Sequence, residues 1–309
     1  MNMTKLTHHI RNLVRFRILF LMMLPALAIV IFNNYIPMFG VILAFKNYNF
    51  SDGIWGSPWV GWENFKYLVQ TDVAWTATRN TIAYNAVFII LNTAGAVALS
   101  IGLNEVRRSK LKKTFQSTLL FPHFLSYVAI SYILYALLGQ AGFINLSVFK
   151  SLGLDPVSWY SDADRWFYIL PIVNTWKHIG YFAVVYLAAI VSIDTEYYEA
   201  ALIDGASKWK QTLHITLPML APVVIVMVLL QISRIFNADF GLFYQAPLNS
   251  GSLLPATEVI DTFVYRNFLL NGNVGMSAAA GFYQATVGFV LVLVTNFIVR
   301  RFSKENALF

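Results

Sequence analysis

The sequence contains no cysteine and few charged residues. Of its 309 residues, 12% are charged and 58% are hydrophobic, whereas an average soluble domain is about one quarter charged. The absence of cysteine excludes disulfide-stabilised folds, cysteine-ligated zinc sites and cysteine nucleophiles. The shortage of charge leaves too few polar residues to cover a water-soluble globule of this size, so we expect much of the surface to face lipid.

The sequence also lacks the motifs of nucleotide hydrolysis and metal chemistry. The phosphate-binding pattern Gly-x4-Gly-Lys-Ser/Thr is absent, so we do not expect this chain to hydrolyse ATP. Its five histidines have no metal-ligand spacing, and no pair of Asp or Glu residues falls inside a hydrophobic run. We therefore expect no metal, no cofactor and no catalytic residue in the chain itself.

Long hydrophobic runs are abundant. Five segments contain no Asp, Glu, Lys or Arg, and they cover residues 18–45, 80–104, 114–149, 211–233 and 267–299. A sixth segment, 166–193, contains only Lys177. Since a bilayer-crossing helix needs about 20 mostly apolar residues, we predict an all-α membrane protein with six transmembrane helices. These helices are predicted at residues 16–40, 80–103, 116–138, 167–191, 217–238 and 277–300.

The distribution of basic residues predicts the orientation of these helices. Fourteen of the 22 Lys and Arg residues lie in the two terminal segments and in the loops after the second and fourth predicted helices. Five lie in the remaining loops. Because Lys and Arg favour the cytoplasmic side, we place both termini in the cytoplasm. The net charge of +7 is then a topology signal and gives no reason to expect binding to nucleic acid.

The first 17 residues are basic, with apolar residues between the charges. We expect 1–17 to be an amphipathic cytoplasmic lead-in that anchors to the inner membrane surface. The hydrophobic run that follows is longer than the about 7–15 residues of a signal peptide, so we expect no cleavage. Residues 18–309 then form the six-helix transmembrane domain.

The loops on the external side are rich in aromatic residues. These are Trp55, Trp59, Trp62 and Trp75 in the first loop and Trp159, Tyr160 and Trp166 in the second. One interpretation is an aromatic belt at the membrane interface. The other is a surface that docks a partner protein or a carbohydrate, because flat rings stack on sugars.

The cytoplasmic loop 194–218 has the features of two short helices joined by a turn. Asp194 or Thr195 is suited to cap the first helix, and Gly205 to end it in the left-handed conformation. Pro218 fits the first turn of the fifth transmembrane helix, where its missing N–H is not needed. From these residues alone, the loop is either a protrusion that fits a partner's groove or an ordinary amphipathic loop.

A sequence motif in this loop resembles that of a known family. The pattern Glu-Ala-Ala-x3-Gly-x9-Ile-x-Leu-Pro is matched at Glu199, Ala200, Ala201, Gly205, Ile215, Leu217 and Pro218. It is similar to the signature of the membrane subunits of binding-protein-dependent ABC importers. Segments 37–48, 53–61, 176–180 and 256–266 resemble the carbohydrate-uptake branch, and within it the LplB-like group associated with complex oligosaccharides.

The resemblance implies a fold, a location and a set of partners. The fold would be that of a type I ABC importer permease in the bacterial cytoplasmic membrane, paired with a second, different permease chain. Two ATPase subunits would bind ATP and Mg, and an external solute-binding protein would deliver an oligosaccharide. The residues implied to couple to the ATPase are Glu199, Ala200, Ala201, Asp204, Gly205, Ile215, Leu217 and Pro218. Among them, Glu199 would be the acidic contact and Gly205 the bend.

Polar residues recur at helical spacing inside the predicted spans. Candidates to line a solute path are Asn85, Asn92, Tyr127, Ser131, Tyr135, Asn174, Lys177, Tyr181, Gln231, Arg234 and Asn237. Such residues usually face the interior of the bundle, where they bind solute or hold helices together. Lys177 and Arg234 also suggest the hypothesis that the sugar contains uronic acid.

Three other functions remain as alternatives. An ion-coupled secondary transporter would have paired acidic residues in the membrane and often inverted repeats, and neither is apparent. Only the family resemblance argues against the same importer class with a peptide or another polar solute as its cargo. A membrane scaffold without transport would not need the motif of loop 194–218.

Overall fold

The computed structural model of the chain describes residues 16–302. Within this range every regular element is helical, and strand-like pairing is limited to an isolated antiparallel bridge between Lys46 and Trp59. The predicted all-helical fold is therefore confirmed. Of the predicted lead-in at 1–17, residues 1–15 lie outside the described residues.

Several helices are long and apolar enough to cross a membrane. Four qualify alone, namely Arg17–Phe45, Asp72–Asn104, Lys208–Ile232 and Val274–Arg301. Two bent pairs bring the number to as many as six within the described range, namely Ser109–Phe124 with Tyr127–Leu138 and Ala163–Val191 with Thr195–Ile203. Helices occur in all six predicted regions, while a count of six spans and their orientation stay predictions.

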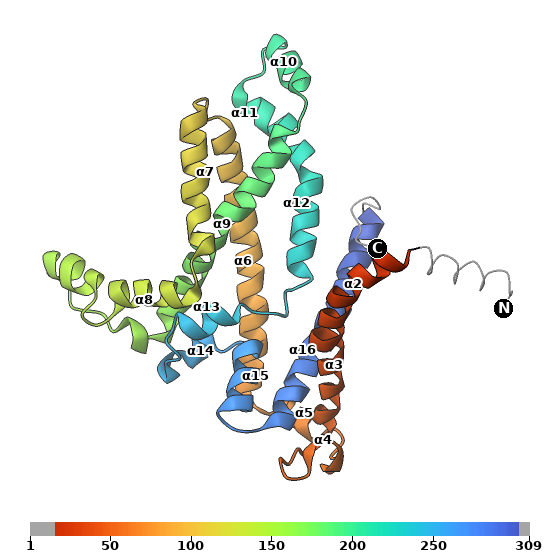
Figure 1. Cartoon of the computed structure of the whole chain (residues 1–309). Helices are drawn as coiled ribbons and strands as arrows, with labels where there is room; N and C mark the ends of the chain where they lie inside the picture. Colours follow the sequence, from red (N-terminus) through yellow and green to blue (C-terminus); the bar gives the residue numbers. More distant parts are fainter. Residues whose placement is uncertain (1–15, 303–309) are drawn as a thin grey trace, which may run out of the picture.

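The first apolar segment is one helical path with changes of pitch. It consists of α2 (Arg17–Val30), the π-helix η1 (Ile31–Tyr35), α3 (Ile36–Met38) and the 3-10 helix η2 (Phe39–Phe45). Residues of α2 bury no side chain within the chain, and the path is held at η2, which packs against α16 (Val274–Phe302). Two short helices, α4 (Gly53–Gly56) and α5 (Glu63–Gln70), follow at the end of the molecule opposite α10 (Figure 1).

The centre of the molecule is a close pair of long helices. α6 (Asp72–Asn104) and α9 (Ala163–Val191) pack along each other, and α7 (Ser109–Phe124) also packs against α9. α6 begins at Asp72, about two turns before the predicted start at residue 80. At Gly180 a Cβ atom would lie 1.9 Å from the carbonyl oxygen of Leu119, so only glycine permits this approach of α9 to α7.

The predicted third helix, 116–138, is wrong as a continuous helix. It is split into α7 and α8 (Tyr127–Leu138), whose axes differ by 97°, and α8 turns away from the bundle (Figure 1). Pro122 lies in the last turn of α7, where it removes a backbone donor. The break follows at Leu125 and Ser126, both extended, and Ser126 Oγ accepts the Ala129 N–H at 3.2 Å to start α8.

The predicted fifth helix also ends earlier than expected. α12 (Leu217–Ile232) stops six residues before the predicted end at 238. The chain then turns, and Asn85 Nδ2 of α6 donates hydrogen bonds to the carbonyls of Ile235 at 2.8 Å and Asn237 at 3.2 Å. These long-range contacts satisfy backbone groups that would otherwise continue the helix.

A set of short helices connects α12 to α16. They are α13 (Phe240–Gln245), η6 (Gly251–Leu253), α14 (Leu254–Thr257) and α15 (Ile260–Leu269). Asn80 Nδ2 of α6 donates to the carbonyls of Pro255 and Glu258, both at 3.0 Å. The two hydrogen bonds of Asn80 attach the segment to α6. Within the segment, an ion pair joins Glu258 to Arg266. In the second loop, η3 (Ile144–Phe149) and η4 (Trp159–Ser161) lie between α8 and α9.

Candidate functional site

Loop 194–218 projects from one end of the molecule as two short helices (Figure 1). α10 (Thr195–Ile203) leaves α9 at an angle of 69°, and α11 (Lys208–Gln211) leads back toward α12. Asp194 accepts the Glu196 N–H at 3.0 Å, which confirms Asp194 as the cap of the first helix. Ser207 caps α11 in the same way, through Lys210 N at 3.4 Å.

The predicted end of α10 at Gly205 is also confirmed. Gly205 has a φ of +73°, in the left-handed region. The Ala206 N–H donates to the carbonyl of Ala201 at 2.9 Å, and the Gly205 N–H to that of Leu202 at 3.1 Å. This is the Schellman pattern, which closes a helix and reverses the chain. The turn between α10 and α11 therefore depends on glycine at this position.

Pro218 has a different setting from the one predicted. It is the second residue of α12, but the helical path into α12 already begins at Lys208 and passes through the π-helix η5 (Thr212–Thr216). The fifth span thus starts before the proline. A π turn widens the helix just ahead of Pro218, which removes the clash between its ring and the preceding carbonyls. The same arrangement recurs at Pro37, which follows η1.

The tip of the loop is exposed and apolar. Glu199, Ala200, Asp204, Gly205 and Pro218 are exposed, and the other three motif residues are partly buried. Two large apolar side chains stand free of the rest of the described chain, with Ile203 87% and Trp209 70% exposed. Exposed apolar residues rimmed by charge are typical of a protein interface. The coupling roles of the eight residues stay predictions.

A cavity of about 460 Å³ lies between α6, α9, α12 and the turn after α12. Six of the eleven predicted path residues line it, namely Asn85, Asn92, Asn174, Gln231, Arg234 and Asn237. His178, which shares the polar face of Asn174 in the sequence, also lines the cavity. Apolar residues that were not predicted complete the wall, including Phe88 and Phe182.

The cavity wall contains an incompletely paired amide group. Asn92 Nδ2 donates to Asn174 Oδ1 at 3.0 Å, and both residues are buried. The Oδ1 atom of Asn92 has no hydrogen-bond partner within the described residues. A buried acceptor without a partner is unusual, and it belongs to a residue that lines the cavity.

Lys177 does not line this cavity. Its Nζ atom donates to three carbonyls at the end of α7, those of Pro122 at 3.4 Å, His123 at 3.0 Å and Leu125 at 2.5 Å. Lys177 is buried, and its charge lies at the negative end of the α7 dipole. The structure thus places this cation at the break between α7 and α8.

Of the other four candidates, three lie on α8, and Tyr181 lies on α9 two turns after Asn174 on the same face. The Tyr127 hydroxyl donates to Asp239 Oδ2 at 2.6 Å and lies 3.2 Å from His178 Nε2, so it adjoins the cavity wall without lining it. Ser131 bonds to its own helix at the Val128 carbonyl. Tyr135 packs edge-on against Tyr160, and Tyr181 stacks on His123 with centroids 4.9 Å apart.

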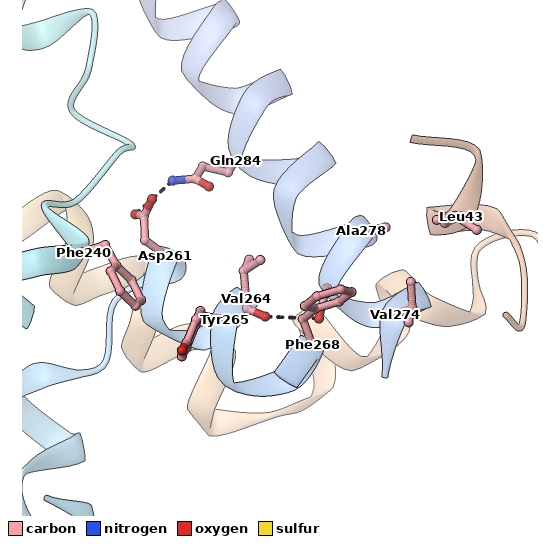
Figure 2. A pocket seen from close by; sticks show the side chains of 10 residues that line it. Leu43, Phe240, Asp261, Val264, Tyr265, Phe268, Val274, Ala278 and Gln284 are labelled. Atoms are coloured by element: carbon pink, nitrogen blue, oxygen red, sulfur yellow. Dashed lines mark hydrogen bonds between the residues drawn. The ribbon is translucent and has the colours of Figure 1, made fainter. Parts of the chain in front are cut away.

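A second cavity, of about 570 Å³, was not predicted. Its wall comes from η2, α13, α15 and α16 and is mostly apolar, with Phe240, Val264 and Phe268 among the lining residues (Figure 2). The polar end is formed by Asp261, which accepts hydrogen bonds from Gln284 Nε2 at 3.1 Å and Ala238 N at 2.8 Å. Burial raises the pKa of Asp261. This lining suits apolar groups better than a polyhydroxylated solute.

In residues 16–302 no three His, Asp or Glu side chains are grouped closely enough to hold a metal ion. His178, which lines the first cavity, contacts Tyr127 and lies 4.0 Å from Asp239 Oδ2. The chemistry that the described site offers is therefore hydrogen bonding, aromatic packing and one guanidinium.

Known proteins resemble this chain over almost its whole length. The family described as binding-protein-dependent transport system inner membrane component matches residues 94–304. Protein LplB of Bacillus subtilis (strain 168) is 32% identical, covering 93% of this chain and 90% of its own. The polygalacturonan/rhamnogalacturonan transport system permease protein YteP of the same organism is 32% identical over 96% of this chain and 91% of its own.

Solved structures resemble it as well. A bacterial ABC transporter involved in the import of the acidic polysaccharide alginate contains a chain that matches with a TM-score of 0.87 and 29% identity, covering 96% of this chain and 99% of that one. A bacterial alginate ABC transporter in complex with an alginate pentasaccharide-bound periplasmic protein gives a TM-score of 0.85 and 29% identity, covering 95% and 98%.

Proposed function

Because the chain belongs to the family of binding-protein-dependent transport system inner membrane components, we propose that it forms the solute path of an ABC importer for oligosaccharides. It crosses the inner membrane six times with both termini in the cytoplasm. A second, different permease chain completes the path. An external solute-binding protein delivers the sugar, and two ATPase subunits, which bind ATP and Mg, drive the transport.

One observation carries this proposal. Asn85, Asn92, Asn174, Gln231, Arg234 and Asn237 come from separate parts of the sequence and line a single cavity. The helices that form this cavity, α9 and α12, are joined directly by loop 194–218. A partner that moves the loop therefore acts on two walls of the cavity. Coupling of this kind requires that the partner contact the loop differently in its two states.

The solute is proposed to be an acidic oligosaccharide. Arg234 supplies the cavity with a guanidinium, which pairs with a carboxylate through two parallel hydrogen bonds. The relatives named for polygalacturonan/rhamnogalacturonan and for alginate concern acidic polysaccharides. In the earlier hypothesis Lys177 was a second cation of the path, and its contacts with α7 assign it instead to the helix end.

The alternatives differ in their energy source and cargo. No Asp or Glu is among the residues that line the first cavity, and an ion-coupled carrier would place paired carboxylates there. A peptide importer would use the same loop, and it would be distinguished by its cargo.

The test is uptake by the assembled transporter in liposomes. We expect oligogalacturonate to enter only with ATP inside and the binding protein outside, and a neutral maltooligosaccharide of equal length to enter much more slowly. Collapse of the ion gradients should have no effect. Uptake without ATP would contradict the importer, and preferred uptake of the neutral sugar or of a peptide would contradict the acidic cargo.

A further inference from the structure

The helical path from loop 194–218 into α12 contains a flexible point. α11, η5 and α12 run without interruption from Lys208 to Ile232. η5 is a π turn, in which each backbone hydrogen bond spans five residues instead of four. Pro218 follows η5 and has no backbone N–H to donate. Helices bend at such places. Motion applied to α11 alone would therefore be absorbed in part before it reached α12.

Tyr198 connects the other short helix to the last residue of η5, directly before α12. Its hydroxyl lies 3.0 Å from Thr216 Oγ1. Thr216 is buried and is the last residue of η5, directly before α12. Tyr198 is partly buried, whereas its neighbour Glu199 is exposed. α10 thus presents Glu199 outward and is bonded through Tyr198 to the base of α12.

The surroundings of this hydrogen bond contain a cavity and a long, exposed ion pair. A cavity of about 380 Å³ adjoins Tyr198 and Thr216 and separates α10 and α11 from the ends of α6 and α9. The nearest charged contact, between Lys208 Nζ and Glu105 Oε2, is 4.0 Å long and exposed. Exposed ion pairs of this kind contribute little.

We propose that the Tyr198–Thr216 hydrogen bond is a positioning contact that makes α10 and α12 move as one body during transport. The proposal rests on the function proposed above. With 16 residues, α12 is about 24 Å long at about 1.5 Å per residue. Its far end carries Gln231 in the cavity wall. Displacement of α10 by an ATPase subunit then reaches the cavity through Thr216 and α12 without passing through α11.

The first test is Tyr198→Phe in the transporter reconstituted with its ATPase subunits, partner permease and binding protein. The ATPase subunits should still co-purify and hydrolyse ATP. Oligogalacturonate uptake per ATP hydrolysed should fall about three- to tenfold, as for the loss of one hydrogen bond. Tyr168→Phe, at a tyrosine of α9 that is 73% exposed, is the matched control and should leave the ratio unchanged.

Variants of Thr216 separate positioning from a general loss of structure. Thr216→Val should reproduce the loss, and Thr216→Ser, which keeps the hydroxyl, should retain the normal ratio. Tyr198→Phe combined with Thr216→Val should be no worse than either change alone. Additive losses in the combined variant would overturn the proposal.

A second measurement does not depend on the solute. Because the chain has no cysteine, spin labels can be placed at Glu196→Cys on α10 and Ile225→Cys on α12 of the assembled transporter. We expect one narrow distance distribution, with and without ATP, that broadens in Tyr198→Phe. Unchanged distances and an unchanged uptake ratio would overturn the positioning role alone. Failure of the ATPase subunits to bind the parent chain would overturn the proposed function as well.

Discussion

Loop 194–218 and the first cavity are built in different ways. The caps and the turn of the loop join residues that are at most five positions apart, as in the bond from Ala206 N to the Ala201 carbonyl. In the cavity wall, Asn92 bonds to Asn174 across 82 positions and Asn85 to Ile235 across 150. The loop is therefore a local structure, and the cavity exists only when distant helices are packed.

Because of this difference, we expect substitutions in the loop and in the packed helices around the cavity to have different effects on transport and stability. A change at the exposed tip of the loop removes a contact with a partner and leaves the helices in place. A change where α6, α7 and α9 approach one another alters both the cavity and the stability of the fold. Transport and stability should thus vary independently for the loop and together for the cavity wall.

The largest effect on transport is expected at Glu199. Glu199→Lys reverses an exposed charge, and repulsion at a docked interface amounts to several kcal/mol, so ATP-driven uptake should fall about 100-fold or more. Membrane insertion and thermal stability should not change. Co-purification of ATPase subunits measures the contact, with Glu63→Lys, also an exposed glutamate, as the control. Normal uptake by Glu199→Lys would contradict the assignment of the loop.

Gly180→Ala tests the packed region. The new Cβ would lie 1.9 Å from the Leu119 carbonyl oxygen, so α7 and α9 must separate. Overpacking typically costs about 1–3 kcal/mol, and we expect lower yield, a lower unfolding temperature and lower uptake together. Gly281→Ala in α16, where no atom lies within 4 Å of the new Cβ, should be neutral. Equal unfolding temperatures for the two variants would contradict this packing argument.

Arg234→Gln addresses the chemistry of the cavity. It removes the guanidinium but keeps hydrogen-bonding capacity, and a charged hydrogen bond contributes about 1.5–3 kcal/mol. Uptake of oligogalacturonate should fall at least tenfold, while that of a neutral oligosaccharide should stay the same or rise. Arg234→Lys should be intermediate because it keeps the charge without the planar fork. An equal decrease for both sugars would show that Arg234 acts on the fold.

The smallest effect is expected at Gly205. The left-handed conformation costs about 1–2 kcal/mol for a residue with a Cβ atom, and Gly205→Val would strain a turn whose φ is +73°. Uptake per ATP should fall, with ATPase binding weakened but present. Gly205→Asn should be better tolerated, since asparagine adopts this conformation more readily. Full activity of Gly205→Val would mean that the turn does not need to keep its shape.

Much of the fold could be predicted because hydrophobic runs report directly on burial in lipid. All six runs contain helices, and the caps at Asp194 and Gly205 follow from short-range preferences of Asp and Gly. The break of the third run was missed, although Pro122 was visible, since a proline near a helix end is compatible with both a kink and a continuous span. In the structure, Lys177 of α9 donates a hydrogen bond to the Leu125 carbonyl at the break and so stabilises the broken form.

Part of the candidate site could also be predicted from a local pattern in the sequence. Polar residues at helical spacing identify a face, and the faces of α6 and α12 do meet at the cavity. Lys177 shares a face with Asn174, but its long side chain reaches the end of α7 instead. The spacing of residues along a helix predicts the direction of each Cβ atom. It does not predict where the end of a long lysine side chain lies.

By itself, the sequence determined which segments are helical and apolar, where the loop motif lies and how its turn is closed. Caps and turns depend on residues a few positions apart, and the location of apolar helices depends on the free energy of removing side chains from water. Both are properties of short segments of the sequence. Only the tertiary structure decided that the third run is broken, that α12 ends at Ile232 and that six polar residues share one cavity. Each of these depends on hydrogen bonds between helices far apart in the chain, which no local pattern can specify.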